Sequence, residues 1–127
     1  MSSEQLLINL NEEQKKAVVN TDGPNLIVAG AGSGKTRVLT TKLAYLIKEK
    51  KAWPNQILCV TFTNKAAKEM QNRVINFLKG DKSAVSWLGT FHSISVKFLR
   101  RHSEALGFTS NFTILDTDDQ KKLIRKI

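Results

Sequence analysis

The stretch NLIVAGAGSGKT, residues 25–36, decides the fold of this 127-residue chain. Its first part, Asn25 to Ala29, is a short and mostly apolar run that predicts a buried strand. Three glycines follow within Gly30 to Gly34, and glycine adopts backbone angles that other residues avoid, so a tight loop is predicted next. A helix should then run from about Lys35 to Lys50, because apolar residues recur on one helical face: Val38, Leu39, Leu43 and Ile47.

Ala29 to Thr36, AGAGSGKT, fit the relaxed form of the Walker A pattern G-x-x-x-x-G-K-[ST], with Ala29 in the place of the first glycine. Such a loop points consecutive backbone N–H groups at phosphate oxygens, and the following helix presents its positive end to them. Lys35 would reach the β- and γ-phosphates, while the Thr36 hydroxyl would ligate Mg²⁺. The predicted site for a nucleoside triphosphate consists of Ala29, Gly30, Ala31, Gly32, Ser33, Gly34, Lys35 and Thr36. The alternative is a glycine-rich turn with an exposed lysine.

The rest of the chain alternates short apolar runs with longer amphipathic ones, which predicts an α/β fold with a parallel βαβαβ sheet and right-handed crossovers. Asn11 and Gln14 have the spacing of a capping box at a helix start. The expected elements are helices from about Asn11 to Val19, Thr63 or Asn64 to Lys79, and His92 to Leu106, strands at Gln56–Phe62 and Val85–Leu88, and a last helix that starts at Asp116 or Thr117, with Gln120 completing a capping box.

Lysine and arginine number 20 against 11 acidic residues, which gives a net charge of +9. This excess favours a polyanionic partner, although it can also serve solubility alone. The single cysteine, Cys59, lies in the apolar run 57–60 and is expected to be a buried thiol without a disulfide. Neither a membrane-spanning stretch nor a signal peptide is evident, so we expect a cytoplasmic protein without a membrane partner.

Four strings occur in an order that resembles the UvrD/Rep/PcrA-type superfamily 1 DNA helicases. They are LNEEQKKAV (10–18), AGAGSGKTRVL (29–39), VTFTNKAAKEM (60–70) and GTFHS (89–93). The resemblance implies a P-loop NTPase (RecA-like) parallel sheet with flanking helices, truncated, plus the start of an inserted helical subdomain. We place the first part at residues 1–107 and the second at 108–127.

In these helicases the first string is the Q motif, so the resemblance implies that the Gln14 amide hydrogen-bonds adenine and that Arg37 lies against the adenine face. The cofactors would be ATP and Mg²⁺. From the residues alone, the favoured role of Gln14 is that of capping-box partner of Asn11, and the alternative for Arg37 is a solvated helix arginine.

The family's motifs Ia and Ib imply a path for single-stranded DNA along Phe62, Thr63, Asn64 and Lys65, and along Thr90, Phe91 and His92. Aromatic rings suit base stacking, while hydroxyl, amide and ammonium groups suit phosphates. The alternatives are that Phe62 belongs to the core, that Thr63 or Asn64 only caps a helix, and that His92 is structural.

ATP hydrolysis also needs an Asp–Glu pair at the end of a later strand and an arginine finger. Phe112 to Asp116 imitates such a strand, but Thr117 stands where the glutamate belongs. The sequence therefore looks like the N-terminal portion of an ATP-dependent 3′–5′ DNA helicase acting on single strands and duplex junctions, whose C-terminal helicase domains are missing. Alone, it is expected to bind nucleotide without significant turnover. The alternatives are a non-catalytic nucleotide- and DNA-binding module and a small P-loop kinase.

Overall fold

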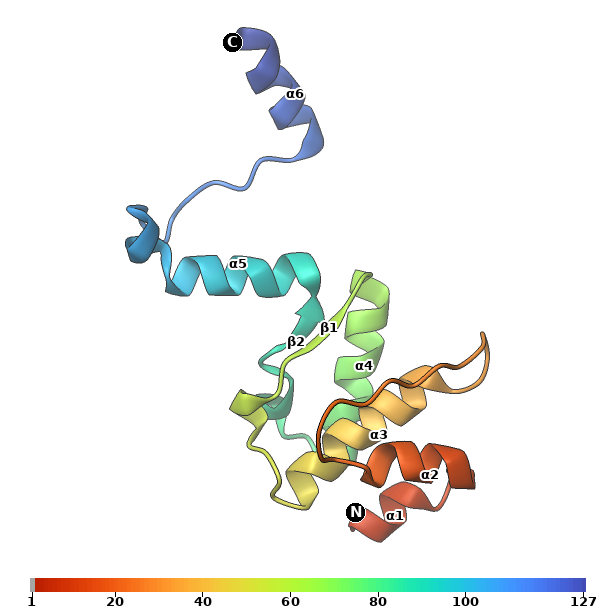
Figure 1. The fold of residues 1–127 in the computed structure, drawn as a ribbon. Helices are drawn as coiled ribbons and strands as arrows, with labels where there is room; N and C mark the ends of the chain where they lie inside the picture. Colours follow the sequence, from red (N-terminus) through yellow and green to blue (C-terminus); the bar gives the residue numbers. More distant parts are fainter. Residues whose placement is uncertain (1) are drawn as a thin grey trace. The chain divides into compact units, whose positions relative to one another are not determined.

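The computed structural model describes residues 2–127. They divide into two compact units, of which the first ends at Ile94 and the second begins at Ser95. The unit that ends at Ile94 is a mixed α/β structure with a parallel two-stranded sheet (Figure 1). It contains α1 (Ser3–Leu7), α2 (Glu12–Val19), α3 (Lys35–Lys48), the 3₁₀ turn η1 (Pro54–Gln56), β1 (Cys59–Thr61), α4 (Asn64–Phe77), the 3₁₀ turn η2 (Lys82–Val85), β2 (Leu88–Thr90) and the first residues of α5 (Phe91–Arg101).

The predicted helices of this unit are confirmed, and local signals explain where they start. Asn11 caps α2 through the predicted capping box with Gln14. Thr63 caps α4, where its hydroxyl accepts from the Ala66 N–H at 3.1 Å. The helix α3 ends at Lys48, close to the predicted Lys50. The residues that follow α4 turn the chain with positive φ at both Lys79 and Gly80.

The core of the unit lies between α3, α4 and the sheet. Leu43 and Ala44 of α3 pack with Met70 and Val74 of α4, and Ala44 and Val74 are fully buried. Leu88 of β2 joins the same cluster, as does Cys59 of β1, whose free thiol is buried as predicted. Burial raises the pKa of this thiol, because the low-dielectric surroundings disfavour the thiolate.

The sheet pairs Cys59 with Leu88, Val60 with Gly89 and Thr61 with Thr90. Both predicted strands are shorter than expected, and the second is displaced. Val85 belongs to η2, so the strand predicted at Val85–Leu88 lies instead at Leu88–Thr90. Apolar residues three apart suit a 3₁₀ turn as well as the end of a strand, which is why the sequence pattern misplaced the element.

The prediction of a strand at Asn25–Ala29 is wrong, because residues 24–30 have no regular secondary structure. Leu26 and Val28 are 90% and 88% exposed, so the apolar run is not buried either. A strand needs a neighbour for its backbone hydrogen bonds, and in the part of the chain that is described the sheet consists of β1 and β2 without this segment. The segment therefore connects α2 to the loop before α3 as extended chain.

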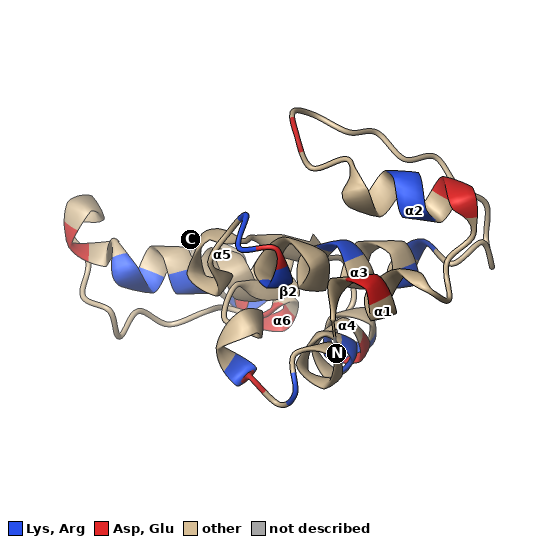
Figure 2. Ribbon diagram, turned by 90° about the horizontal axis from the view of Figure 1, so that it is seen from below, with Lys and Arg blue, Asp and Glu red and all other residues tan. Residues whose placement is uncertain are grey.

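The unit that begins at Ser95 holds most of α5, the 3₁₀ turn η3 (Ser103–Leu106) and α6 (Thr117–Lys126). The predicted helix from His92 to Leu106 is thus an α-helix followed by a 3₁₀ turn that ends at Gly107, where φ is 74°. Basic residues colour the second half of α5 (Figure 2). Among them, Arg100 lies over the Phe112 ring at 4.9 Å and donates to the Ser110 carbonyl.

Asp116 caps α6, and its carboxylate accepts from the Asp119 N–H at 2.8 Å. The helix start predicted at Asp116 or Thr117 is confirmed, but the cap is Asp116 itself rather than a Thr117–Gln120 box. No helix in residues 2–127 is long and apolar enough to cross a membrane.

Candidate functional site

The glycine-rich loop forms a tight turn immediately before α3. The Ser33 N–H donates to the Gly30 carbonyl at 3.2 Å, and Gly32 has a φ of 75°, which a type II turn requires at its third residue. Gly34, with a φ of 85°, is the N-cap residue of α3. Because glycine has no side chain to cap the helix, the first-turn N–H groups are left to an external acceptor such as an anion.

Lys35 and Thr36 are the first two residues of α3, so both stand at the positive end of the helix. Lys35 is exposed and Thr36 is half-buried. The Thr36 hydroxyl is a hard oxygen ligand in the first turn of α3, and the Thr36 carbonyl accepts from the Thr40 hydroxyl at 2.8 Å. Residues 2–127 contain no cluster of three His, Cys, Asp or Glu side chains that could hold a metal. Mg²⁺ fits here only if phosphate oxygens and water complete its shell, as is usual for this ion.

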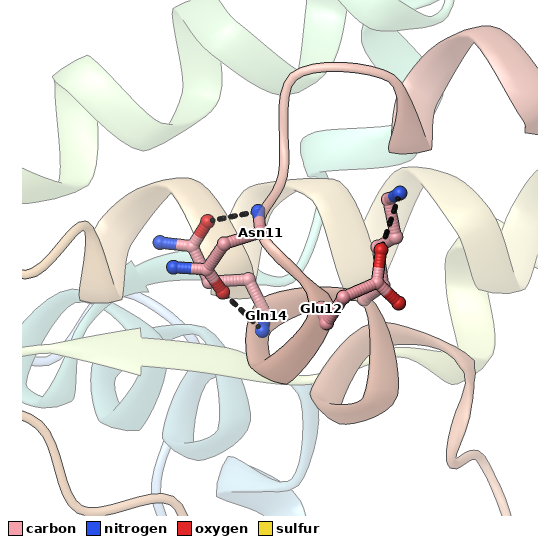
Figure 3. Close-up of polar contacts among 4 residues, drawn as sticks. Asn11, Glu12 and Gln14 are labelled. Atoms are coloured by element: carbon pink, nitrogen blue, oxygen red, sulfur yellow. Dashed lines mark hydrogen bonds and ion pairs between the residues drawn. The ribbon is translucent and has the colours of Figure 1, made fainter.

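Gln14 connects α2 to this loop and also takes part in the cap of α2, whose two hydrogen bonds with Asn11 are drawn in Figure 3. Its Oε1 accepts from the Asn11 N–H at 3.0 Å, while its own N–H donates to Asn11 Oδ1 at 2.8 Å. Its Nε2 donates to the Ser33 carbonyl at 3.1 Å. The capping-box role is therefore confirmed, and the same amide keeps one N–H and one lone pair for another partner. Adenine recognition by Gln14 stays a prediction.

A hollow of about 540 Å³ opens at the loop and brings several predicted residues together. Its lining consists of Gln14, Gly32, Ser33, Gly34, Lys35, Thr36 and Arg37, together with Glu69 and Arg73 of α4. Arg37 Nη1 donates to the Asn9 carbonyl at 3.4 Å, so its guanidinium is held toward the segment before α2. A second hollow of about 470 Å³, on which Gln14, Ala29 and Lys35 also border, lies along residues 27–29.

Sequence reasoning missed Glu69 and Arg73 as residues of the loop hollow. They form an ion pair one helical turn apart, with 2.5 Å between Arg73 Nη2 and Glu69 Oε1. The i,i+4 spacing on the helix after FTNKAA was visible in the sequence. What the spacing did not show is that this face of α4 turns toward the loop before α3, which depends on the packing of the two helices.

The aromatic residues of the two predicted DNA motifs meet. The Phe62 and Phe91 rings have centroids 5.2 Å apart and are inclined by 44°. Phe62 follows β1 and Phe91 follows β2, and parallel pairing of these strands brings their carboxyl ends to the same edge. Phe62 is 88% exposed, so the alternative that it belongs to the core is wrong. Two exposed rings side by side are an apolar platform that a base can stack on.

The polar residues of these motifs differ in how free they are. The hydroxyl of Thr63 caps α4, whereas Asn64 and Lys65 in its first turn are exposed. Thr90 is only 6% exposed, and its hydroxyl accepts from the Ser93 N–H at 3.1 Å. His92 is exposed at the start of α5. Asn64, Lys65 and His92 are thus the polar side chains that flank the aromatic pair and reach solvent.

Residues 10–127 match the family model described as the UvrD/REP helicase N-terminal domain. The chain belongs to this family. The UvrD/REP match contains every predicted site residue, from Gln14 to His92, so the resemblance carried by the four sequence strings is confirmed.

Two curated relatives show how much of a UvrD/REP helicase the chain represents. It is 54% identical over 122 residues to the ATP-dependent DNA helicase PcrA of Staphylococcus epidermidis, and the match covers 96% of this chain. It is 53% identical over the same number of residues to the PcrA of Staphylococcus aureus. In both cases the chain spans 17% of the length of the relative.

Proposed function

We propose that this chain is the N-terminal ATP-binding portion of an ATP-dependent DNA helicase that moves 3′ to 5′ on single-stranded DNA and unwinds duplexes at junctions. Residues 1–107 would belong to a RecA-like P-loop domain, and residues 108–127 would begin a helical subdomain inserted in it. The second half of the helicase would come from segments that this chain does not contain. The relatives' printed names, which state ATP dependence and DNA helicase activity, support this proposal.

The observation that carries the proposal is the AGAGSGKT loop at the start of α3. It puts the uncapped first turn of a helix, the Lys35 ammonium and the Thr36 hydroxyl at one hollow large enough for a nucleotide. The helix end and Lys35 would hold the β- and γ-phosphates, with Gln14 and Arg37 beside the base. Mg²⁺, held by Thr36 and the phosphates, would neutralise charge on the transferred group.

DNA contact is the second part of the proposal. The Phe62–Phe91 platform would stack against a base of the single strand, and Lys65 and Asn64 would contact phosphates beside it. Thr63 and Thr90 would affect DNA binding indirectly. Their hydroxyls accept from N–H groups in the first turns of α4 and α5, the helices that position Lys65 and Phe91. In the full helicase, closure of two RecA-like domains around ATP would move DNA past this platform.

Turnover by this chain alone is expected to be negligible. Hydrolysis in this fold requires a carboxylate that orients the attacking water. Within residues 2–127, the carboxylate in the lining of the 540 Å³ hollow belongs to Glu69 and is paired with Arg73, and Glu13, which borders the second hollow, lies in the first turn of α2. Asp116, the residue that resembles an aspartate at a strand end, caps α6 instead.

The test is titration of the purified chain with a fluorescent ATP analogue in the presence of Mg²⁺, followed by an ATPase assay with and without single-stranded DNA. Binding is expected in the wild type and should fall at least about tenfold in Lys35→Ala, since one charge-assisted contact is lost. Lys16→Ala is the control, because Lys16 is an exposed lysine of α2 away from both hollows. Binding that is equal in all three proteins would refute the nucleotide site, and a Lys35-dependent, DNA-stimulated ATPase rate would refute inactivity of the chain alone.

A further inference from the structure

A third hollow, of about 480 Å³, lies at the far ends of α3 and α4 and shares no residue with the two hollows at the loop. Apolar side chains make its floor, and two lysines and an aspartate stand in its wall. The lining consists of Ile47, Lys48, Lys50, Ala52, Trp53, Pro54, Leu78, Asp81 and Ser83. We refer to this surface as the Trp53 groove.

Trp53 is the unusual member of this surface, because it is a large aromatic residue that is 69% exposed. Tryptophan is normally well buried in monomeric proteins, and exposed tryptophans are enriched among residues that dominate binding energy at interfaces. The backbone at this position is held locally, because the backbone N–H of Trp53 donates to Gln56 Oε1 at 3.0 Å and Pro54 begins η1 directly after it. The indole is therefore presented to solvent by an ordered turn.

The lining of the Trp53 groove has a small excess of positive charge, with Lys48 and Lys50 against Asp81. The two segments that contribute the lining, 47–54 and 78–83, carry five lysines and two acids in all, and one of these lysines, Lys51, donates to the Thr21 hydroxyl at 2.9 Å. The acid in the wall, Asp81, keeps its negative charge, because the hydrogen bonds that its carboxylate accepts from the Ser83 hydroxyl at 2.6 Å and the Ser83 N–H at 2.9 Å lower its pKa. An apolar floor with a basic rim complements an acidic ligand that carries an apolar side chain.

Two of these lysines occupy backbone positions that favour glycine. Lys50 and Lys79 follow α3 and α4 with φ values of 55° and 56°, respectively. Glycine is the usual residue at such a helix end because positive φ costs it nothing. The fold thus keeps a charged side chain beside the Trp53 groove where a glycine would suit the backbone better.

The Trp53 groove lies at the opposite edge of the sheet from the proposed DNA platform. The turns η1 and η2, which form one side of the groove, precede β1 and β2, whereas Phe62 and Phe91 follow these strands. A nucleic acid that followed the platform would therefore run along the other edge. This separation favours a protein ligand for the groove over a continuation of the DNA path.

We propose that the Trp53 groove binds an acidic peptide segment of a partner protein, with an apolar or aromatic side chain of that segment against Trp53 and its carboxylates against the lysines at the rim. Such a surface would attach the chain to a partner without covering the nucleotide hollow or the DNA platform. The binding mode is that of an acidic motif with one apolar anchor.

The experiment measures fluorescence anisotropy of a labelled peptide, Asp-Glu-Asp-Phe-Leu-Asp-Glu-Asp, titrated with the full 127-residue chain. A second peptide has serines in place of Phe-Leu. The first peptide is expected to bind, with an affinity that falls as salt rises. Trp53→Ala should weaken it at least about tenfold, and Lys48→Glu about threefold or more. Lys16→Glu is the matched control on α2 and should leave the affinity within about twofold, since Lys16 is exposed and is not part of the lining of the groove.

Lys50→Gly separates binding from folding. Because positive φ costs glycine nothing, this variant is expected to raise the thermal midpoint of unfolding and to lower the affinity for the peptide. Several outcomes would overturn the proposal: no binding of the acidic peptide, equal binding of the serine peptide, or equal loss in Lys16→Glu. It would also be overturned if Trp53→Ala abolished self-association of the chain or binding of single-stranded DNA, since the groove would then belong to a second copy or to the DNA path.

Discussion

Gln14 shows at the residue scale how one side chain serves structure and a candidate site together. Its oxygen completes the cap of α2, and its Nε2 holds the Ser33 carbonyl of the loop. Gln14→Glu keeps the acceptor for the Asn11 N–H, removes the donor to the Ser33 carbonyl and adds a negative charge beside the proposed phosphate site. We expect this substitution to lower the affinity for the fluorescent ATP analogue several-fold. The thermal midpoint of unfolding should stay close to that of the wild type.

Asn11→Ala is the complementary change, because it removes the cap and leaves the Gln14 amide in place. It should lower the free energy of unfolding by about 1 kcal/mol without a comparable loss of nucleotide affinity. Were both variants to lose stability and affinity in the same proportion, the contact between Gln14 and Ser33 would have no separate role.

Cys59 gives a prediction about pH. Burial raises the pKa of its thiol above the ordinary value of 9.0, so the unfolded chain loses this proton before the folded chain does. The contribution of the neutral buried thiol is fully present below pH 9.0 and is lost as the pH rises through the folded-state pKa. The difference in free energy of unfolding between wild type and Cys59→Ala should therefore shrink from pH 8 to pH 10 in urea titrations. A difference that stays constant over this range would show that the thiol titrates alike in both states.

At the scale of elements, Gly89 is the residue of β2 against which the first turn of α5 packs closely. A Cβ at this position would lie 2.5 Å from Ser93 Oγ, which itself donates to the Thr90 carbonyl at 3.1 Å. Gly89→Ala should displace this hydroxyl and cost about 1 kcal/mol, the worth of the lost hydrogen bond. In a Ser93→Ala background the same substitution should cost nothing or stabilise, because alanine suits a strand better than glycine.

Urea unfolding of the four proteins in this cycle measures the coupling directly. Equal costs of Gly89→Ala in both backgrounds would mean that something other than the Ser93 hydroxyl resists the methyl group. Ile94 is the alternative, since its Cδ1 would be 3.4 Å from the new Cβ.

The elements also show what the sequence predicts and where it stops. Helix starts at Asn11, Thr63 and Asp116 were predictable because a cap acts within four residues of the chain. The strand at Asn25–Ala29 failed because apolar character alone does not supply a neighbour for its backbone groups. Pairing is a non-local property, and within residues 2–127 the sheet consists of β1 and β2 without this segment.

At the scale of the whole molecule, the candidate sites combine local motifs with packing that no motif encodes. The loop at Gly30–Gly34 and the Phe62 and Phe91 strings were found from sequence, because each is a contiguous pattern. The participation of Arg73 in the loop hollow and the assembly of the Trp53 groove were not, because they depend on how α3, α4 and the 3₁₀ turns pack.

The net charge of +9 provides the last prediction, because it separates the electrostatic and stacking parts of DNA binding. Affinity for single-stranded DNA should fall linearly with salt on logarithmic axes, with a slope of about −0.7 for each phosphate neutralised. Lys65→Ala removes one exposed cation beside the platform and should reduce the magnitude of this slope by about 0.7. Phe62→Ala removes a stacking ring and should lower affinity by about tenfold at every salt concentration without a change of slope.

The two substituted residues, Phe62 and Lys65, lie within four residues of each other. A general disturbance of this edge would therefore change both the salt slope and the DNA affinity in each variant. Lys68→Ala, an exposed lysine of α4 outside the predicted DNA motif residues, is the control for charge alone. If it changes the slope as much as Lys65→Ala does, the excess of positive charge attracts DNA without a defined path. If the slope responds to Lys65 and the affinity at high salt responds to Phe62, the aromatic pair and its neighbouring lysine form one contact surface, in which charge brings the strand to the sheet edge and the rings hold its bases.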